Sequence, residues 1–321
     1  SFGKNFLKYL LSKKKKPSRI VIYSRDELKQ FEMMESFSEK KYSILRYFIG
    51  DIRDLDRLKR AIVNVDIVVH AAALKQVPTA EYNPFEVIKT NVIGAQNIVE
   101  ACLDPNSSVK KVIALSTDKA AAPINLYGAS KLCSDKLIIA ANNIVGKKKI
   151  SFSVVRYGNV MGSRGSVIPK FIEQSKKNGV ITITDPRMTR FNITMQQSIK
   201  MVEWSIINCL GGEVIVPKIP SMKVVDLACA ISKKSKIKYV GIRAGEKIHE
   251  DLITSPESYN TIDIGKYYVI LPQNNHKLIS YYLKNKKGKK VTEKFSYNSY
   301  NNTDYLSVNQ IKKLLVELDI I

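Results

Sequence analysis

Short β-branched runs alternate with longer helical stretches through the first half of the chain, and this order most constrains the fold. The runs at 19–23, 47–51 and 66–70 each precede a helical pattern, and those at 112–115 and 152–157 continue the series. Neighbouring parallel strands need a crossover connection, which a helix supplies. The alternation therefore predicts an α/β fold, a Rossmann-type doubly wound parallel sheet.

The series begins with a helical pattern at 3–11 where a strand is expected. In a dinucleotide-binding fold that helix follows a central strand and a glycine-rich turn. We therefore expect Ser1 and Phe2 to be the tail of such a turn and to contact the cofactor, with the first strand missing from this sequence. The regular alternation ends near residue 160. This predicts an NADP-binding Rossmann domain at 1–160 and, at 161–321, a smaller α/β domain that mainly binds substrate and from which the chain can cross back.

The net charge of +23 over 321 residues raises the question of an acidic partner. The lysine clusters are not interleaved with aromatic residues, as a base-stacking groove needs, so we expect a lysine-rich surface and no nucleic acid. No apolar run approaches the length of a membrane span, and the first residues do not resemble a signal peptide. We therefore expect no membrane and a cytoplasmic protein. The four cysteines show no metal-ligand spacing, so no metal site is predicted and reduced thiols are expected: Cys102, Cys133, Cys209 and Cys229.

A polar cluster follows the strand predicted at 112–115. Ser116 and Thr117 end this strand, and the next helix opens near Tyr127 with Lys131 four residues later, on the same helix face. An ammonium lowers the pKa of a nearby phenol, and the phenolate can take the proton of an alcohol while its carbon gives hydride to a nicotinamide. We predict that Thr117, Tyr127 and Lys131 are catalytic and that Tyr127 and Lys131 also contact the cofactor.

The end of the second strand of a dinucleotide fold selects the cofactor. Here Ser24, Arg25 and Lys29 make a site for a ribose 2′-phosphate, which favours NADP over NAD. Asp26 belongs to the same set of predicted contacts, and Asp51 is expected beside the adenine. The alternative is that Asp26 is a helix N-terminal charge, that Arg25 is solvated and that Asp51 caps a strand end.

Asp118 and Lys119 follow Thr117 directly. A plain dehydrogenase or epimerase does not need this extra acid and base, whereas a sugar 4,6-dehydratase does. That enzyme oxidises C4, removes the C5 proton, expels the C6 hydroxyl and returns the hydride to C6. Asp118 suits the acid, and Lys119 suits the base provided that burial lowers its pKa. The alternative is a surface ion pair in a loop.

The segments 116–120 and 123–131 resemble the inverting UDP-N-acetylglucosamine 4,6-dehydratases that open pseudaminic-acid synthesis. These enzymes are extended short-chain dehydrogenases/reductases. Stretches near 23–30, 70–84, 156–167, 185–191, 216–222 and 241–250 are also similar. The resemblance implies NADP retained through the cycle, a UDP-sugar substrate and a homo-oligomer. It also implies that Lys119 replaces the Glu of the retaining enzymes, so that C5 is reprotonated on the other face.

The same resemblance adds expected contacts by position. Arg187 and Arg190 are expected either to bind diphosphate or to pair with acidic residues in the core. Two other functions remain open, a UDP-sugar 4-epimerase and a non-catalytic basic module that binds NADP or nucleic acid. The further cofactor contacts are Ile52, Ala71, Ala72 and Ser116, and the sugar and diphosphate contacts are Lys75, Asn159, Ser163, Arg164, Arg243 and Glu246.

Overall fold

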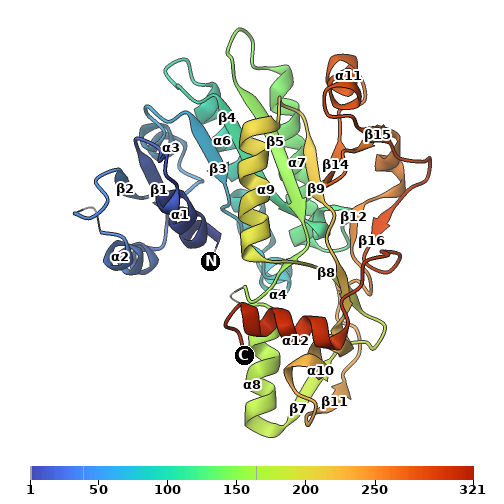
Figure 1. Ribbon diagram of the computed structural model, residues 1–321. Helices are drawn as coiled ribbons and strands as arrows, with labels where there is room; N and C mark the ends of the chain where they lie inside the picture. Colours follow the sequence, from blue (N-terminus) through green and yellow to red (C-terminus); the bar gives the residue numbers. More distant parts are fainter. Residues whose placement is uncertain (1, 39, 164) are drawn as a thin grey trace.

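A seven-stranded sheet forms the centre of the computed structural model, which describes residues 2–38, 40–163 and 165–321 (Figure 1). Its order is β15-β13-β14-β9-β5-β4-β3. The four strands from β3 to β9 are mutually parallel, and the other three are antiparallel to their neighbours. The bounds are β3 (Ile67–His70), β4 (Lys111–Thr117), β5 (Ser151–Tyr157), β9 (Val214–Pro217), β13 (Thr261–Asp263), β14 (Tyr267–Ile270) and β15 (Lys289–Lys290). The predicted Rossmann-type α/β fold is confirmed.

The first segment of the chain lies beside this sheet and packs against its helices α6 (Gly94–Leu103) and α9 (Met195–Asn208). Strands β1 (Ile20–Ser24) and β2 (Leu45–Ile49) pair in parallel in a sheet of their own, which shares no strand pairing with β3. Helices α1 (Phe2–Ser12), α2 (Glu27–Ser36) and α3 (Leu55–Ala61) belong to the same segment. Its small apolar core is centred on Leu7, Leu11 and Leu45. The expected central strand between β1 and β3 stays a prediction.

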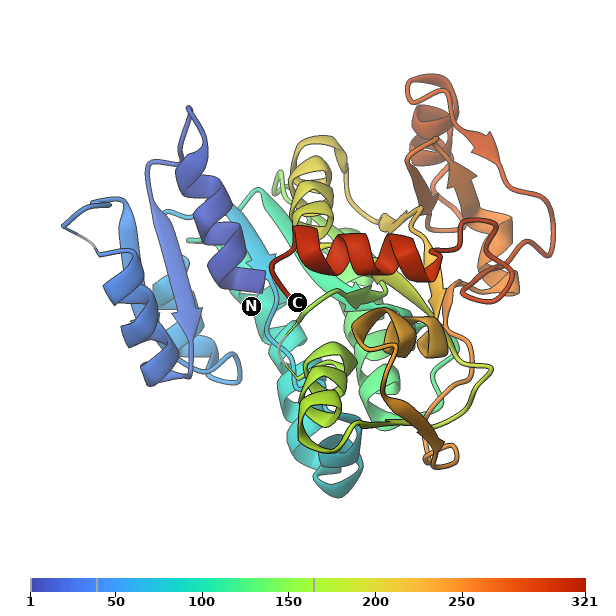
Figure 2. The same cartoon turned by 60° about the horizontal axis from the view of Figure 1, so that its bottom comes forward.

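A second lobe has its own apolar core below the sheet. In Figure 2, where this lobe faces the reader, α12 lies above α8 and α10. The chain reaches the lobe after β5, returns to the large sheet through α9 (Met195–Asn208) and β9, and then enters the lobe again. Because the chain crosses between the two parts more than once, a single domain boundary near residue 160 stays a prediction. The elements of the lobe and of the segment before it are β6 (Asn159–Val160), α8 (Val167–Asn178), β7 (Val180–Ile183), β8 (Thr189–Ile193), β10 (Ser221–Lys223), α10 (Val224–Ile231), β11 (Lys236–Tyr239) and α12 (Val308–Glu317).

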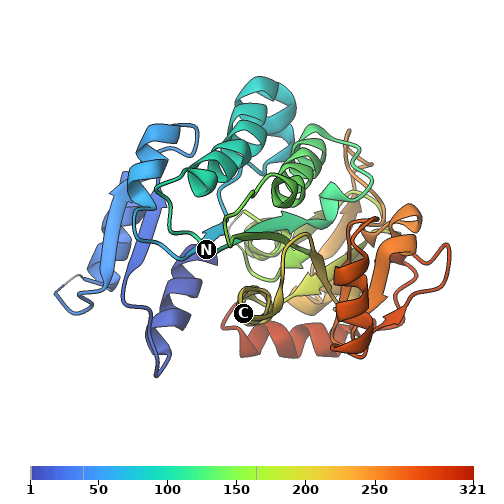
Figure 3. The ribbon, with the colours of Figure 1, turned by 90° about the horizontal axis from the view of Figure 1, so that it is seen from above.

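Helices cover both faces of the large sheet. Figure 3 shows α6 (Gly94–Leu103) and α7 (Leu126–Ala140), in teal and green, on one face and α9 on the other. The central strands are therefore apolar on both sides, and Val112, Ile113 and Ala114 of β4 are fully buried. Burial of a valine or isoleucine side chain such as Val112 or Ile113 contributes about 1.5–3 kcal/mol. The helical stretch between β3 and β4 consists of α4 (Val77–Tyr82), α5 (Pro84–Ile88), a π-helical turn η1 (Lys89–Ile93) and α6.

Two elements of the C-terminal half depend on contacts that the local sequence does not show. Helix α10 begins at Val224, because Ser221–Lys223 pairs with β8 as strand β10. The polar segment at 274–304 contains a helix, α11 (His276–Lys284), which buries Leu278 and Tyr282. None of the helices in the described residues is long and apolar enough to cross a membrane. The remaining elements are η2 (Asp118–Ala120), η3 (Ala141–Asn143), β12 (Asp251–Ile253), η4 (Ser255–Asn260) and β16 (Tyr297–Asn298).

Candidate active site

A tight connection from β4 through η2 to α7 brings the predicted catalytic residues together. Thr117 begins η2 with extended backbone, and Asn125 caps α7 by accepting a hydrogen bond from the Gly128 N–H at 2.8 Å. A Cβ at position 128 would lie 2.2 Å from the Lys119 carbonyl oxygen, so only glycine allows this close approach. The first turn of α7, which carries Tyr127, is therefore packed against the backbone of Lys119.

Asp118 and Lys119 form a largely buried ion pair. The Asp118 side chain is 1% exposed, and its Oδ1 accepts hydrogen bonds from Thr117 Oγ1 at 2.9 Å and from Lys119 Nζ at 3.1 Å. Asp118 Oδ2 is buried with no hydrogen-bond partner among the described residues. The surface-pair interpretation is therefore wrong. A buried carboxylate with one unused oxygen can take part in proton transfer.

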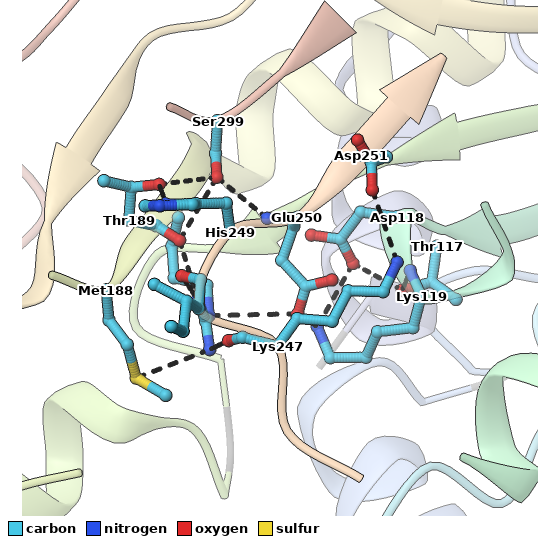
Figure 4. Close-up of polar contacts among 12 residues, drawn as sticks. Thr117, Asp118, Lys119, Met188, Thr189, Lys247, His249, Glu250, Asp251 and Ser299 are labelled. Carbon is cyan, nitrogen blue, oxygen red and sulfur yellow. Dashed lines mark hydrogen bonds and ion pairs between the residues drawn. The ribbon is translucent and has the colours of Figure 1, made fainter. Parts of the chain in front are cut away.

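A second carboxylate faces the same ammonium. Glu250 Oε1 lies 3.2 Å from Lys119 Nζ, and Glu250 is 2% exposed (Figure 4). Burial lowers the pKa of Lys119, but the negative charges of Asp118 and Glu250 outweigh burial and raise the pKa above its usual value. The expectation that burial would make Lys119 a ready base is therefore wrong for this structure. Glu250 escaped sequence reasoning because no spacing relates it to Lys119.

Tyr127 is half-buried at the start of α7. Burial raises its pKa, and the positive charge of Lys119 together with hydrogen bonding to Thr117 opposes that rise. Lys131 is 3% exposed, and burial lowers its pKa against the opposing charge of Asp135. The phenol pKa is therefore raised, contrary to the prediction from the Tyr127–Lys131 spacing, and the cation that counteracts burial is Lys119.

A buried charge network lies behind Lys131. Asp135, four residues further along α7, accepts a hydrogen bond from Ser116 Oγ at 2.6 Å and lies 3.9 Å from an Arg156 guanidinium nitrogen. Arg156 in turn donates to Glu257 of η4 at 2.8 Å. The hydroxyl of Ser116, a predicted cofactor contact, is thus engaged with the protein. The i, i+4 spacing from Lys131 was the available signal for Asp135.

His70 ends β3 beside this network. It is 3% exposed, and its Nε2 has no partner among the described residues. Burial, with a smaller contribution from the charge of Lys131, lowers the pKa of His70 to about 3. His70 is therefore a neutral group at the same sheet edge as Lys131. The predicted cofactor contacts Ala71 and Ala72 follow it and are exposed.

The predicted cofactor contacts from the first segment occupy the ends of β1 and β2. Asp26 is the N-cap of α2 and also pairs with Lys29, so its interpretation as a helix N-terminal charge is confirmed. Arg25 is about half exposed and reaches Asp51 at 3.5 Å. Asp51 is held mainly by Arg53, at 2.7 Å.

Three further predicted cofactor contacts differ in their surroundings. Ser24 Oγ accepts a weak hydrogen bond from the Asp26 N–H at 3.3 Å. Ile52 is buried, and its carbonyl oxygen accepts from Asn97. Phe2 stacks on Phe6 at the start of α1, whereas Ser1 lies outside the described residues.

The predicted sugar and diphosphate contacts come from several loops. Asn125 Nδ2 donates to the Gly245 carbonyl at 2.7 Å, which holds the turn carrying Arg243 and Glu246 against the start of α7. Arg243 is exposed, and Glu246 Oε2 is buried with no partner among the described residues. The structure thus brings this turn next to the catalytic connection.

Asn159 in β6 also has a buried, unpartnered side-chain oxygen within the described part of the chain. Ser163 lies in the turn after β6, and Lys75 is exposed just before α4. Arg164 lies outside the described residues. Arg190 lies 3.9 Å from Glu250 and donates to backbone carbonyls, so it pairs in the core, whereas Arg187 pairs with Asp185 at the surface.

Comparison with known proteins gives consistent matches over nearly the whole chain. The model of a family described as polysaccharide biosynthesis protein matches residues 1–272. The chain is 51% identical to a UDP-N-acetylglucosamine 4,6-dehydratase (inverting) of Campylobacter jejuni subsp. jejuni serotype O:23/36 (strain 81-176), covering 98% of this chain and 94% of that protein. It is 42% identical to a UDP-glucose 4-epimerase of Rickettsia akari (strain Hartford), covering 94% and 88%. The X-ray structure of Pen from Bacillus thuringiensis superposes with a TM-score of 0.89 at 35% identity, covering 100% and 95%.

Proposed function

The chain belongs to the polysaccharide biosynthesis protein family, and we propose that it is a hydro-lyase, an inverting UDP-N-acetylglucosamine 4,6-dehydratase. The observation that carries this proposal is the buried Asp118–Lys119 pair beside Tyr127. Among acid–base groups, oxidation at C4 needs only the phenol, which takes the hydroxyl proton, whereas loss of water across C5 and C6 needs an additional base and acid.

The residues at the carboxyl ends of β1, β3 and β4 suit a nicotinamide dinucleotide. Arg25 is exposed enough to reach a ligand, and the small exposed side chains of Ala71 and Ala72 leave room for a flat group. When bound, such a cofactor accepts the C4 hydride and later returns it to C6. We propose NADP over NAD because Arg25 offers planar recognition of a 2′-phosphate, while Asp26 is already committed to capping α2 and to Lys29.

Tyr127 takes the proton of the C4 hydroxyl as the hydride leaves. The ammonium of Lys119 and the hydroxyl of Thr117 favour the phenolate against burial. Lys131 lies on the same face of α7, one turn further on, where an ammonium can hold a ribose hydroxyl. Asp135 opposes the effect of burial on the pKa of Lys131 and so favours its charged form.

Asp118 and Lys119 then carry out the elimination. A shift of one proton from Lys119 Nζ to Asp118 Oδ1, 3.1 Å away, turns the ion pair into a neutral amine and a carboxylic acid. The amine removes the C5 proton, the acid protonates the departing C6 hydroxyl, and water is lost. After hydride returns to C6, protonation of C5 from solvent on the face opposite Lys119 gives the inverted product, UDP-2-acetamido-2,6-dideoxy-β-L-arabino-hexos-4-ulose, and Tyr127 releases to solvent the proton that it took from the C4 hydroxyl.

The UDP-sugar is held, in this proposal, by the loops around the catalytic connection. Arg243 supplies charge for the diphosphate, and Glu246, Asn159, Ser163 and Lys75 offer polar groups to the sugar and nucleotide. The buried, unpartnered oxygens of Glu246 and Asn159 support this assignment, because buried acceptors are usually satisfied and a sugar hydroxyl can satisfy them.

Incubation with UDP-N-acetylglucosamine and NADP tests the function. We expect a 4-keto-6-deoxy product by NMR, with one solvent deuteron at C5 when the reaction is run in D2O. Unchanged substrate would refute the proposal, and formation of the C4 epimer alone would indicate an epimerase. Lys119→Ala separates the two activities, because dehydration should be lost whereas epimerisation does not need this side chain.

We also propose a cytoplasmic homo-oligomer. Tyr82 of α4, Phe85 of α5 and Ile93 of η1 expose large apolar side chains, which suits contact with a second copy. All four cysteines are unpaired, as expected in a reducing compartment. Sedimentation of the wild-type protein and of Phe85→Asp tests the oligomer, since the charged variant should dissociate if this surface is the interface.

A further inference from the structure

We propose that Glu250, which no motif singles out, is a positioning residue for the elimination step: its carboxylate holds the Lys119 amine beside Asp118 and governs how readily that amine gives up its proton. The proposal rests on the dehydration proposed above. It assigns a function to a buried carboxylate that hydride transfer leaves unused.

The backbone around Glu250 is fixed, so its side chain has a defined direction. The Glu250 N–H donates to Ser299 Oγ at 2.9 Å, and its carbonyl accepts from the Ser299 N–H at 2.8 Å. Ser299 Oγ in turn contacts Thr189 Oγ1 at 2.7 Å. These contacts anchor the segment before β12 to β8. Figure 4 shows the Glu250 side chain extending from this anchor toward Lys119.

Four charged or titratable groups face Lys119 from the surrounding elements. Asp118 of η2 and Glu250 are negative, Arg190 of β8 is positive, and Tyr127 of α7 is a phenol. Glu250 Oε1 lies between two cations, 3.2 Å from Lys119 Nζ and 3.9 Å from Arg190 Nε. Glu250 Oε2 is buried with no partner among the described residues. One carboxylate thus balances two cations, and it is the second acidic neighbour of the proposed base.

The second carboxylate has a chemical consequence. Transfer of the Lys119 proton to Asp118 leaves a neutral amine and a neutral acid, and the negative charge of Glu250 opposes this transfer by stabilising the ammonium. Arg190 acts in the opposite direction on Lys119. Glu250 therefore keeps the pair ionised until the substrate is in place, and it fixes the amine within reach of Asp118.

Glu250→Gln tests this role, because the amide keeps the volume and a hydrogen-bond acceptor but removes the charge. Asp251→Asn is the matched control: it makes the same charge change one residue later, where the partners are Lys247 and Asn298. The first readout is the pH dependence of C5–H exchange with D2O. The second is the pKa of the Lys119 amine, followed by NMR with ¹⁵N-lysine and assigned with Lys119→Arg. The third is C4 oxidation, followed by the absorbance of reduced nicotinamide.

We expect Glu250→Gln to move the limb of the exchange profile, and the Lys119 titration, about one to three pH units lower, the usual effect of removing an adjacent opposite charge. C4 oxidation and the control variant should match wild type. An unmoved limb, or equal slowing of oxidation and exchange, refutes the proposal. If Glu250→Gln does not fold, Glu250→Asp replaces it and should move the titration in the same direction. If wild type forms no 4-keto-6-deoxy product, the proposed function fails, while the lysine titration without sugar still decides whether Glu250 controls Lys119.

Discussion

Asp135 is the buried carboxylate whose loss we expect to damage the protein most. It is 3% exposed and lies among the charges of Lys131 and Arg156, which are 3% and 2% exposed. Asp135→Ala removes the negative charge that opposes the effect of burial on the pKa of Lys131, whereas Arg156 keeps its 2.8 Å contact with Glu257. The cost should therefore fall mainly on Lys131.

Asp135 forms a buried ion pair with Arg156 at 3.9 Å, and removing one partner of such a pair costs about 3–5 kcal/mol, because an uncompensated charge stays in the interior. Domain stabilities are about 5–15 kcal/mol, so Asp135→Ala should lose a large part of the total. Asp135→Asn keeps the volume and the acceptor for Ser116 Oγ at 2.6 Å. It should therefore be less damaging than the alanine variant while still removing the charge.

Urea unfolding measures these losses, and Asp66→Ala is the control. Asp66 forms an ion pair with Lys110 at 2.7 Å, shorter than the 3.9 Å pair of Asp135 with Arg156, but both side chains are more than half exposed, so its loss should cost at most about 1 kcal/mol. The pH dependence adds a signature. Without Asp135 the folded-state pKa of Lys131 falls further below its unfolded value, so stability should rise with pH from that lowered pKa up to the usual lysine pKa. If Asp135→Ala unfolds no more easily than Asp66→Ala, the reasoning about the buried network is wrong.

Three further outcomes follow from the site. In Gly128→Ala the added Cβ would lie 2.2 Å from the Lys119 carbonyl oxygen, so the backbone must shift. We expect urea unfolding to show a loss of about 1–3 kcal/mol in stability, and the rate of product formation to fall about a hundredfold. A fully active variant would contradict this. His70, with its pKa lowered to about 3, should show no ring titration by NMR in the neutral range. Its contribution to stability should fall as the pH drops from the usual histidine pKa toward 3. A normal titration would show that the ring is not buried as described. Arg25→Ala should raise the Kd for NADP about tenfold or more in calorimetric titration and leave the Kd for NAD unchanged, and equal effects on both would argue against a 2′-phosphate contact.

The order of strands and helices up to β5 was predictable because each element has a local signal. The runs at β1, β3 and β4 are β-branched and apolar, and the helices between them are periodic. The lobe was less predictable. Strand β8 pairs with β6 and β10, and β7 pairs with β11, so these short strands depend on partners tens of residues away. Helix α11 was missed because only Leu278 and Tyr282 of its residues are buried in a stretch rich in lysine and asparagine.

In the site too, some residues lie close together in the sequence and could be predicted, whereas others come from distant segments and could not. Tyr127 stands between two cations that the local sequence reveals, Lys119 before it and Lys131 after it. Each cation has a buried carboxylate that modifies its pKa, Glu250 for Lys119 and Asp135 for Lys131. The outcome differs between the two lysines. At Lys131 burial outweighs the charge of Asp135, and the pKa is lowered. At Lys119 the charges of Asp118 and Glu250 together outweigh burial, and the pKa is raised.

Because the pKa of Lys131 is lowered and that of Lys119 is raised, the two lysines suit different roles. Lys131, a cation with a lowered pKa near His70, suits the proposed contact with a ribose hydroxyl. A cation held protonated by two carboxylates must transfer a proton before it can act as a base, so elimination is coupled to the state of Asp118 and Glu250. Oxidation at C4 can therefore proceed while Lys119 is still an ammonium, and C5 deprotonation follows only when C4 oxidation has made that proton acidic. On this argument the acidity of the C5 proton sets the order of the two steps, and the proposed role of Glu250, 131 positions from Lys119 in the sequence, is to keep the amine protonated until C4 has been oxidised.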